Sequence, residues 1–281
     1  MKAAVVQMVS GTAVAANLQR AEALLEEAAA QGATLAVLPE YFCLMGRTDR
    51  DKVDAREAPG HGPIQDFLAA TARRLGLWIA AGTVPLQTPE ADRVFNTTWV
   101  YAPDGHGVAR YDKIHLFAFD RGSEHYDEAA SIVPGTAPQT FTLPDPAATD
   151  GNGWRIGLSI CYDLRFPELY RALSGAVSDH SAPCDAMLVP AAFTHTTGKA
   201  HWEVLLRARA IENQCYVLAS AQGGTHENGR RTFGHSMIID PWGEVVAALD
   251  EGEGVACAEL SADRLREVRE QLPALRHRRL A

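Results

Sequence analysis

Short apolar runs alternate along the chain with stretches of helical periodicity, and this alternation constrains the fold more than any other feature. The apolar runs are residues 3–8, 34–38, 78–84, 154–160, 186–189 and 216–221. Helical periodicity marks residues 18–28, 64–75, 166–173, 200–213 and 262–272. Such alternation is typical of an α/β protein with buried strands. Asn17 is expected to cap the first helix, which Gly32 ends.

Two hairpins modify this α/β pattern. Turn-forming residues separate the paired runs 95–101 and 107–111, and again 236–239 and 245–248. Hairpins add antiparallel strands, so the sheets are predicted to be mixed. The stretch 120–153 is rich in Gly, Pro and acidic residues and is expected to be irregular. Because no linker or repeat interrupts the pattern, residues 1–281 are predicted to form a single domain.

Charge and hydropathy exclude several classes of partner. The 26 Lys and Arg residues against 35 Asp and Glu give a net charge of −9, which disfavours nucleic acid and anionic lipid as partners. No apolar run approaches the ~18–20 residues of a membrane span. The start of the chain lacks the apolar region of a signal peptide, so we expect a cytoplasmic protein.

The cysteines and glycines argue against metals and cofactors. The five cysteines are an odd number, widely spaced and without a C-x-x-C pair, which disfavours a disulfide framework or a zinc site. Neither a phosphate-binding loop nor a dinucleotide-binding glycine pattern occurs. We therefore expect no cofactor and no metal.

Cys161 has the most informative setting of the five thiols. It follows the apolar run 154–160, and Pro167 suits the first turn of a helix just beyond it. A thiol at such a strand-to-helix corner is expected to face the positive helix end, which favours thiolate, with backbone N–H groups available as an oxyanion hole. The alternative is a buried cysteine that acts only as a small apolar side chain.

Two other strand ends carry charged residues, Glu40 and Lys113. Sites in α/β proteins form beyond the carboxyl ends of strands. If the sheets bring these ends together, Cys161, Glu40 and Lys113 supply a nucleophile, a base and a cationic stabiliser. The alternative for Glu40 and Lys113 is that each is an ordinary loop residue.

Three segments resemble the hallmark segments of the nitrilase superfamily of carbon–nitrogen hydrolases. They are Leu38–Glu40, Tyr111–Phe117 and Ile160–Leu169. The resemblance covers essentially the whole chain and implies an α-β-β-α sandwich, in which helices flank two mixed sheets. It makes Cys161 the nucleophile, Glu40 the general base and Lys113 the electrostatic stabiliser. Glu128 best matches the second glutamate of the family and Glu124 matches it less well; a solvated loop carboxylate is the alternative for Glu128.

Within that superfamily, three further segments look like the deaminated glutathione amidase branch. They are His201–Tyr216, Gly234–Gly243 and His277–Arg279, and the pair Ala221–Gln222 fits the same branch. The branch implies cleavage of deaminated glutathione to 2-oxoglutarate and cysteinylglycine through a thioester acyl-enzyme. The alternatives are an ω-amidase, an N-carbamoyl amino acid amidohydrolase and, from another class, a non-catalytic binding protein on the same fold.

A small anionic substrate needs local cations and a pocket. The candidate substrate-binding residues are Tyr162, Arg165, Phe193, Thr194 and Arg207, with Lys199 as a further cation. An ion pair with Glu203 four residues away is the alternative for Arg207. Residues 193–198 are expected to form a pocket loop, and the long segment 175–184 a surface loop.

The resemblance also implies self-association. Members commonly pair through helices, so we expect a homodimer or a larger assembly. The tail, about residues 262–281, is expected to contact the partner subunit; it carries six arginines, and a solvated helix and tail is the alternative.

Overall fold

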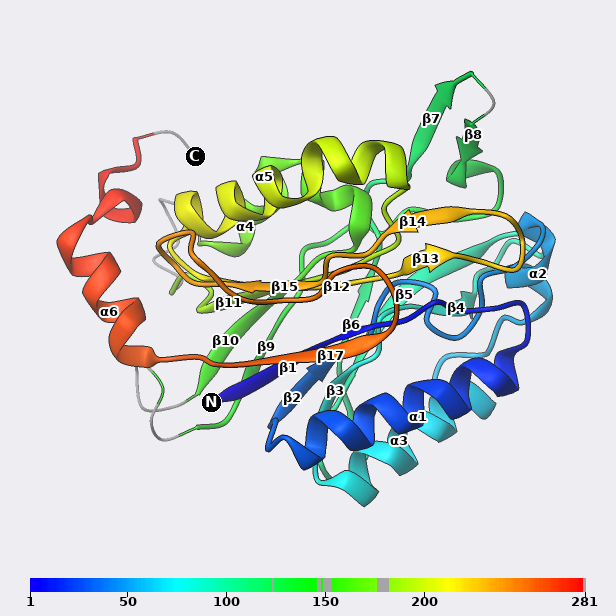
Figure 1. Ribbon diagram of the computed structural model, residues 1–281, viewed down its shortest axis with the longest axis horizontal. Coiled ribbons are helices and arrows are strands. Elements are labelled where there is room, and N and C mark those ends of the chain that lie inside the picture. Colours follow the sequence, from blue (N-terminus) through cyan, green and yellow to red (C-terminus); the bar gives the residue numbers. More distant parts are fainter. Residues whose placement is uncertain (123, 146–147, 149–152, 176–181, 280–281) are drawn as a thin grey trace.

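Two β-sheets pack face to face between layers of helices (Figure 1). The computed structural model describes residues 1–122, 124–145, 148, 153–175 and 182–279. The first sheet has the strand order β17-β1-β2-β3-β5-β4, and β6 also pairs with β5. Its strands are β1 (Lys2–Gln7), β2 (Leu35–Val37), β3 (Trp78–Ala80), β4 (Val84–Gln87), β5 (Val94–Tyr101), β6 (Gly107–Asp112) and β17 (Gly254–Glu259).

The second sheet has the order β16-β15-β12-β11-β10-β9. Its strands are β9 (Thr140–Leu143), β10 (Trp154–Leu158), β11 (Ala186–Ala191), β12 (Tyr216–Ala221), β15 (Met237–Ile239) and β16 (Val245–Ala248). In both sheets the central pairs are parallel and the outer pairs antiparallel. The sheets are therefore mixed, as the alternation of runs and hairpins predicts.

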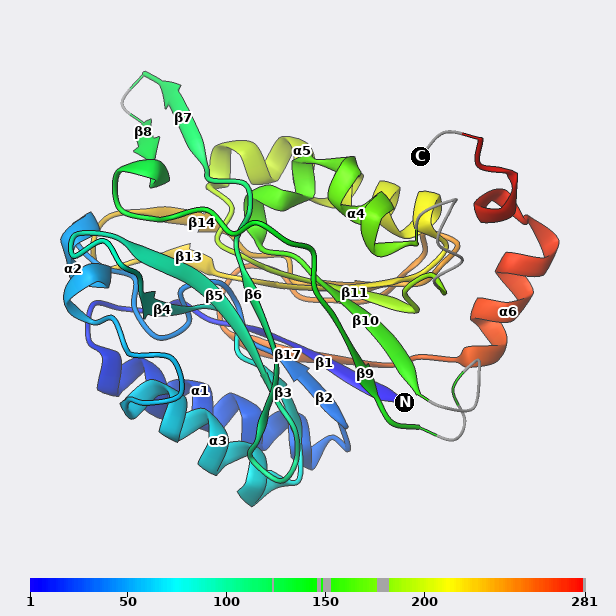
Figure 2. The same cartoon turned by 180° about the vertical axis from the view of Figure 1, so that it is seen from behind.

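Helices cover the outer faces of both sheets (Figure 2). On the first sheet lie α1 (Val14–Ala30) and α3 (Pro63–Leu75), and on the second α4 (Pro167–Leu173) and α5 (His195–Asn213). The remaining helices are α2 (Asp49–Asp54), α6 (Ala262–Gln271), η1 (Glu128–Ala130), η2 (Cys161–Arg165) and η3 (Ala274–His277). This arrangement is the predicted α-β-β-α sandwich.

Strand alternation explains why one chain can fill two cores. In β1, Ala3 and Val5 belong to the cluster that includes the residues of the second sheet, whereas Ala4 and Val6 pack with α1 and α3. Successive side chains of a strand point to opposite faces, so each central strand contributes to both layers. Residues that follow the ends of the strands lie beyond these two apolar cores, so they can be polar.

Several predicted boundaries move. α1 begins at Val14, and Asn17 is not its cap: the Asn17 side chain is buried and bonds the backbone of Gly11 and Cys43. α5 begins at His195 with Thr194 as its N-cap, so residues 195–198 are helical rather than a loop, while the segment 193–197 does line cavities, as predicted.

Regular structure also occurs where the sequence predicts an irregular stretch. The strands β7 (Ala118–Arg121) and β8 (Glu124–Asp127) form a protruding hairpin, and β9 joins the second sheet. The run 78–84 is interrupted at Gly82, whose φ of +50° divides it into β3 and β4. Turn-rich composition hid the hairpin, because its strands are mostly exposed and polar.

The C-terminal helix is attached to its own chain. Arg269 of α6 donates to the Asp185 carboxylate and to the Cys184 carbonyl, and Arg278 donates to the carbonyl of Gly175. Contact between this tail and a partner subunit stays a prediction. Of the predicted 175–184 loop, residues 176–181 lie outside the described residues. Within the described part of the chain, no helix is both long and apolar enough to span a membrane.

Candidate active site

The structure brings Glu40, Lys113 and Glu128 into one buried cluster. Glu40 follows β2 and Lys113 follows β6, and their side chains are 1% and 0% exposed. The Lys113 Nζ lies 2.8 Å from Glu40 Oε1 and 2.7 Å from Glu128 Oε2. One ammonium group therefore bridges two carboxylates, and the cluster has a net charge of −1 when all three are ionised.

Backbone and side-chain donors fix the Glu40 carboxylate. Asn96 of β5 donates its Nδ2 to Oε1 at 2.9 Å, and the Ala192 N–H donates to Oε2 at 3.0 Å. The Asn96 carbonyl also accepts from the backbone N–H of Lys113. Because every donor is buried or part of a strand end, the carboxylate has one orientation.

Glu128 is held just as firmly. The Tyr41 hydroxyl donates to Oε1 at 2.8 Å, and the Phe117 N–H donates to Oε2 at 2.7 Å. Glu128 begins η1 immediately after the β7–β8 hairpin. Glu124 lies opposite Arg121 in the backbone register of that hairpin, and Glu128 is the glutamate whose carboxylate contacts Lys113.

The ion pairs shift the pKa values of their members in opposite directions. Burial acts to lower the pKa of Lys113, but the Glu128 and Glu40 carboxylates outweigh it and raise that pKa. Burial acts to raise the pKa of Glu128, but Lys113 and the bonds from Phe117 and Tyr41 lower it overall. Both groups are therefore charged at neutral pH.

Cys161 lies on a strained corner three residues after the end of β10. Its φ is +48°, a left-handed conformation that is uncommon outside glycine and is frequent at functional sites. Buried Asp163 stabilises the corner, because it accepts from the Ile160 N–H and the His115 N–H. The hydroxyl of Tyr111 donates to the same carboxylate at 2.7 Å.

The expected preference of Cys161 for thiolate is wrong. Burial and the charge of Glu40 raise the pKa of the thiol well above its usual range, and the opposing effect of Lys113 is smaller. The positive end of a helix does not compensate, because Cys161 begins a 3₁₀ turn of five residues rather than a long helix. The resting group is a thiol, and its reaction requires a proton acceptor.

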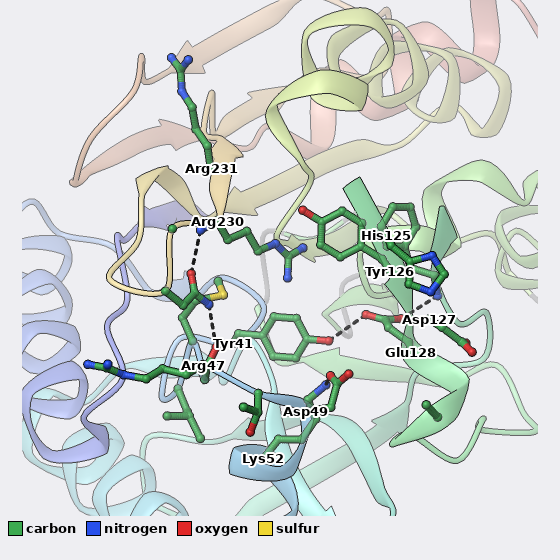
Figure 3. A pocket seen from close by; sticks show the side chains of 18 of the residues that line it. Tyr41, Arg47, Asp49, Lys52, His125, Tyr126, Asp127, Glu128, Arg230 and Arg231 are labelled. Carbon is green, nitrogen blue, oxygen red and sulfur yellow. Dashed lines mark hydrogen bonds and ion pairs between the residues drawn. The ribbon is translucent and has the colours of Figure 1, made fainter. Parts of the chain in front are cut away.

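An inner pocket opens beside this thiol. Four of the five predicted substrate-binding residues line it: Tyr162, Arg165, Phe193 and Thr194. Cys161, Glu128 and Ala192 line it too. A larger chamber of about 890 Å³ adjoins it and shares Phe117, Glu128 and Arg230. Figure 3 shows this chamber, with Tyr41 and Glu128 facing each other across a hydrogen bond.

The other two predicted cations lie elsewhere. Arg207 on α5 pairs with Glu203 at 3.4 Å and donates to the Gly243 carbonyl at 2.9 Å, and it lines neither cavity. Its position favours the alternative of a helix ion pair. Lys199 is exposed on α5. Closeness in sequence to a pocket residue does not place a side chain in the pocket, because successive helical residues point in different directions.

Sequence reasoning missed four groups of the site: Tyr41, Asn96, Ala192 and Arg230. Tyr41 directly follows Glu40, and its φ of +59° is a second left-handed conformation at the site. Asn96 begins an N-x-T triplet, which masks its role as a buried donor to Glu40. Ala192 acts through its backbone, which no side-chain pattern can reveal. Among the described residues, no three His, Cys, Asp or Glu side chains are grouped so that they could hold a metal ion.

Comparison with known proteins agrees with this geometry. The model of the carbon-nitrogen hydrolase family matches residues 2–270. The chain belongs to the carbon-nitrogen hydrolase family. A deaminated glutathione amidase of Synechocystis is 45% identical over 278 residues, which are 98% of this chain and 97% of that protein. An omega-amidase of Danio rerio is 35% identical over 98% of this chain and 94% of that protein.

Solved structures extend the agreement to the fold. Nit3 of Saccharomyces cerevisiae, described as a member of branch 10 of the nitrilase superfamily, superposes with a TM-score of 0.83 at 30% identity. The superposition covers 97% of this chain and 94% of that one. The predicted nitrilase superfamily resemblance and sandwich fold are confirmed. This carbon-nitrogen hydrolase is an amidase of its family, acting on C–N bonds of a small-molecule substrate.

Proposed function

We propose that the chain hydrolyses deaminated glutathione to 2-oxoglutarate and cysteinylglycine, with Cys161 as the nucleophile. The observation that carries the chemistry is the buried Glu40–Lys113 pair beside the Cys161 thiol. The relatives named deaminated glutathione amidase support the substrate. Glu40, Lys113 and Cys161 are all present, and this argues against a non-catalytic binding protein on this fold.

Acylation begins with proton transfer from the thiol to Glu40. The raised pKa of Cys161 makes this transfer necessary, and the Glu40 carboxylate is oriented to accept the proton. The sulfur attacks the amide carbon, and Lys113 and the Tyr162 N–H stabilise the oxyanion. Glu40 then returns the proton to the amide nitrogen as the C–N bond breaks, and a thioester remains on Cys161.

In deacylation, water is the nucleophile and the sulfur of Cys161 is the leaving group. Glu40 accepts a proton from water, whose oxygen attacks the thioester carbon, and the sulfur leaves as a thiol with that proton. Glu128 and Tyr41 position Lys113 through their hydrogen bonds. Loss of one oxyanion donor typically lowers the rate about 10²–10³-fold, so misplacement of Lys113 has a large effect.

The size of the chamber favours a large leaving group. A volume of about 890 Å³ beside the inner pocket accommodates a dipeptide amine, whereas an ω-amidase releases only ammonia. Activity as an ω-amidase is the second candidate, and the Danio rerio relative supports it. An N-carbamoyl amino acid amidohydrolase is the third.

A product assay separates these candidates. Purified enzyme is given deaminated glutathione, 2-oxoglutaramate or N-carbamoyl amino acids, and 2-oxoglutarate or ammonia is measured. The highest kcat/KM is expected for deaminated glutathione. Cys161→Ala is expected to stay folded without turnover, and Cys257→Ala, at a thiol remote from the pocket, is the matched control. Faster hydrolysis of either other substrate contradicts the substrate proposal, and turnover by Cys161→Ala contradicts the mechanism.

We also propose that the protein is a homodimer or larger. Exposed apolar side chains on α5 and on the β15–β16 hairpin support this, namely Val204, Ile211, Trp242 and Val246. Light scattering is expected to give a mass of at least twice 30.4 kDa. A particle of about 30 kDa contradicts the proposal. The five free thiols support a reducing compartment such as the cytoplasm.

A further inference from the structure

An anionic substrate meets an unfavourable charge at the reaction centre. Two carboxylates, Glu40 and Glu128, surround the single ammonium of Lys113, so the cluster has a net charge of −1 when all three groups are ionised. Under the proposed function, on which this inference rests, the acyl half of the substrate carries its own carboxylate. A binding pocket for that half therefore needs a further cation within reach of Cys161.

Arg230 is the cation whose surroundings fit this need. It lies between β13 (Gly223–Thr225) and β14 (Arg231–Phe233), and it lines both the inner pocket and the large chamber. Its Nη2 donates to the Ala192 carbonyl at 2.8 Å, and its guanidinium lies 5.2 Å from the centre of the Tyr126 ring. These two contacts fix the plane of the guanidinium.

The same guanidinium retains donors for a ligand. Its Nε is buried and has no hydrogen-bond partner among the described residues. A buried unpaired donor is costly unless something else satisfies it. A carboxylate that accepts two parallel bonds from a guanidinium edge is the ligand that best satisfies such a donor.

The neighbouring residue Arg231 shows that Arg230 is distinctive. In Figure 3 the guanidinium of Arg230 points toward Tyr41 and Tyr126, whereas that of Arg231, which also borders the chamber, extends in a different direction. Arg231 is about half exposed and pairs with Glu251 at 2.8 Å. Two adjacent arginines therefore differ in direction, burial and partner.

Ala192 links Arg230 to the reaction centre. Its N–H donates to Glu40 Oε2 and faces the Cys161 thiol, while its carbonyl accepts from Arg230. The acyl group stays attached to Cys161 after the amine leaves, so a group bound beside Ala192 belongs to the acyl half. We propose that Arg230 determines specificity by binding the carboxylate of that half.

Arg165, the other arginine of the inner pocket, has a different environment. Its guanidinium lies over the rings of Phe193 and Tyr162 and bonds the Nδ1 of His201 at 3.2 Å. Its contacts are with side chains of the pocket wall rather than with the backbone at the reaction centre. Arg230 is thus the arginine tied directly to the residue that contacts Glu40 and Cys161.

The test compares an anionic and a neutral amide of similar length. Glutaric acid monoamide carries the acyl carboxylate, and pentanamide lacks it. Arg230→Met is expected to lower kcat/KM for the monoamide by about 30-fold or more, mainly through KM, because a buried charge pair is lost. Its kcat/KM for pentanamide is expected to stay within about 3-fold of the wild-type value.

Two further variants separate binding from folding. Arg230→Lys keeps the charge but not the paired donors, so it is expected to recover only part of the activity on the monoamide. Arg231→Met is the matched control, and both substrates are expected to stay within about 3-fold. Thermal unfolding of each variant is measured alongside.

Two results overturn the assignment. If Arg230→Met and Arg230→Lys lower kcat/KM equally for both amides, Arg230 only supports the pocket wall. If neither variant lowers kcat/KM for the monoamide, another group binds the carboxylate. Failure of the proposed function is distinct, since the wild-type enzyme would then hydrolyse 2-oxoglutaramate or N-carbamoyl amino acids faster than deaminated glutathione in the product assay, whatever its preference between the two amides.

Discussion

Replacement of Lys113 by methionine tests the charge balance of the active site. The ammonium is fully buried and makes hydrogen bonds of 2.7–2.9 Å to Glu40 and Glu128. Methionine fills a similar volume but leaves two buried carboxylates facing each other. Breaking a buried ion pair in this way destabilises a protein by about 3–5 kcal/mol, because uncompensated charge remains in the interior.

The loss of stability in Lys113→Met is expected to grow as the pH rises. In the wild-type protein the pKa of Glu128 is lowered by folding, so its contribution to stability is present above the unfolded pKa of about 4.3 and is lost in acid. In Lys113→Met, like charges and burial raise the folded pKa of the carboxyl pair. A raised carboxyl pKa destabilises the folded state as pH rises, so the gap to wild type widens from pH 5 to pH 8.

Urea unfolding followed by circular dichroism at pH 5 and pH 8 measures both effects. Lys199→Met, at an exposed lysine of α5, is the matched control and is expected to change stability by less than about 0.5 kcal/mol. Adding Glu128→Gln to Lys113→Met removes one buried anion and is expected to recover part of the loss. A Lys113→Met protein as stable as wild type at pH 8, or a deficit independent of pH, refutes the reasoning.

Two other predictions concern the backbone and the thiol. Gly82→Ala places a Cβ 2.0 Å from the Pro39 carbonyl oxygen at a φ of +50°, and it is expected to destabilise the protein by more than about 2 kcal/mol in urea unfolding. Gly76→Ala, at a positive φ but in open space, is the control and is expected to cost about 1 kcal/mol. Equal losses of stability in the two variants contradict a steric clash at Gly82. Alkylation of Cys161, followed by mass spectrometry, is expected to accelerate up to pH 9 without a plateau, because its thiol pKa is raised; a plateau near pH 7 contradicts a protonated resting thiol.

The strand ends explain why much of the site could be predicted. Glu40 and Cys161 follow apolar runs, which are recognisable because burial in a parallel sheet favours continuous apolar side chains. Lys113 follows the second strand of a hairpin that its turn residues mark. Glu40 follows β2 of the first sheet, Lys113 follows β6 of the same sheet, and Cys161 follows β10 of the second sheet. The face-to-face packing of the two sheets brings these ends together (Figure 1). The residue pattern of the strand ends and the packing of the sheets therefore indicate the same active site.

The missed groups depend on contacts between distant segments. Arg230 is one of two adjacent arginines, and only the folded β13–β14 turn decides which of them reaches Ala192 and the inner pocket. Ala192 contributes its peptide groups, which are the same for every residue type except proline. The direction of the Cys161 pKa shift likewise depends on burial and on Glu40, which lies 121 positions away in the chain. None of these has a local signature.

The pairing of β1 with β17 has a consequence for synthesis of the chain. β1 is made first, and its antiparallel partner is made about 250 residues later. At about 5–20 residues per second, one edge of β1 waits about 12–50 s on the ribosome before its partner emerges. During that interval an apolar strand edge is open to pairing with other chains. We expect the yield of folded enzyme to depend on chaperones that protect this edge during translation, and to fall sharply when β17 is deleted.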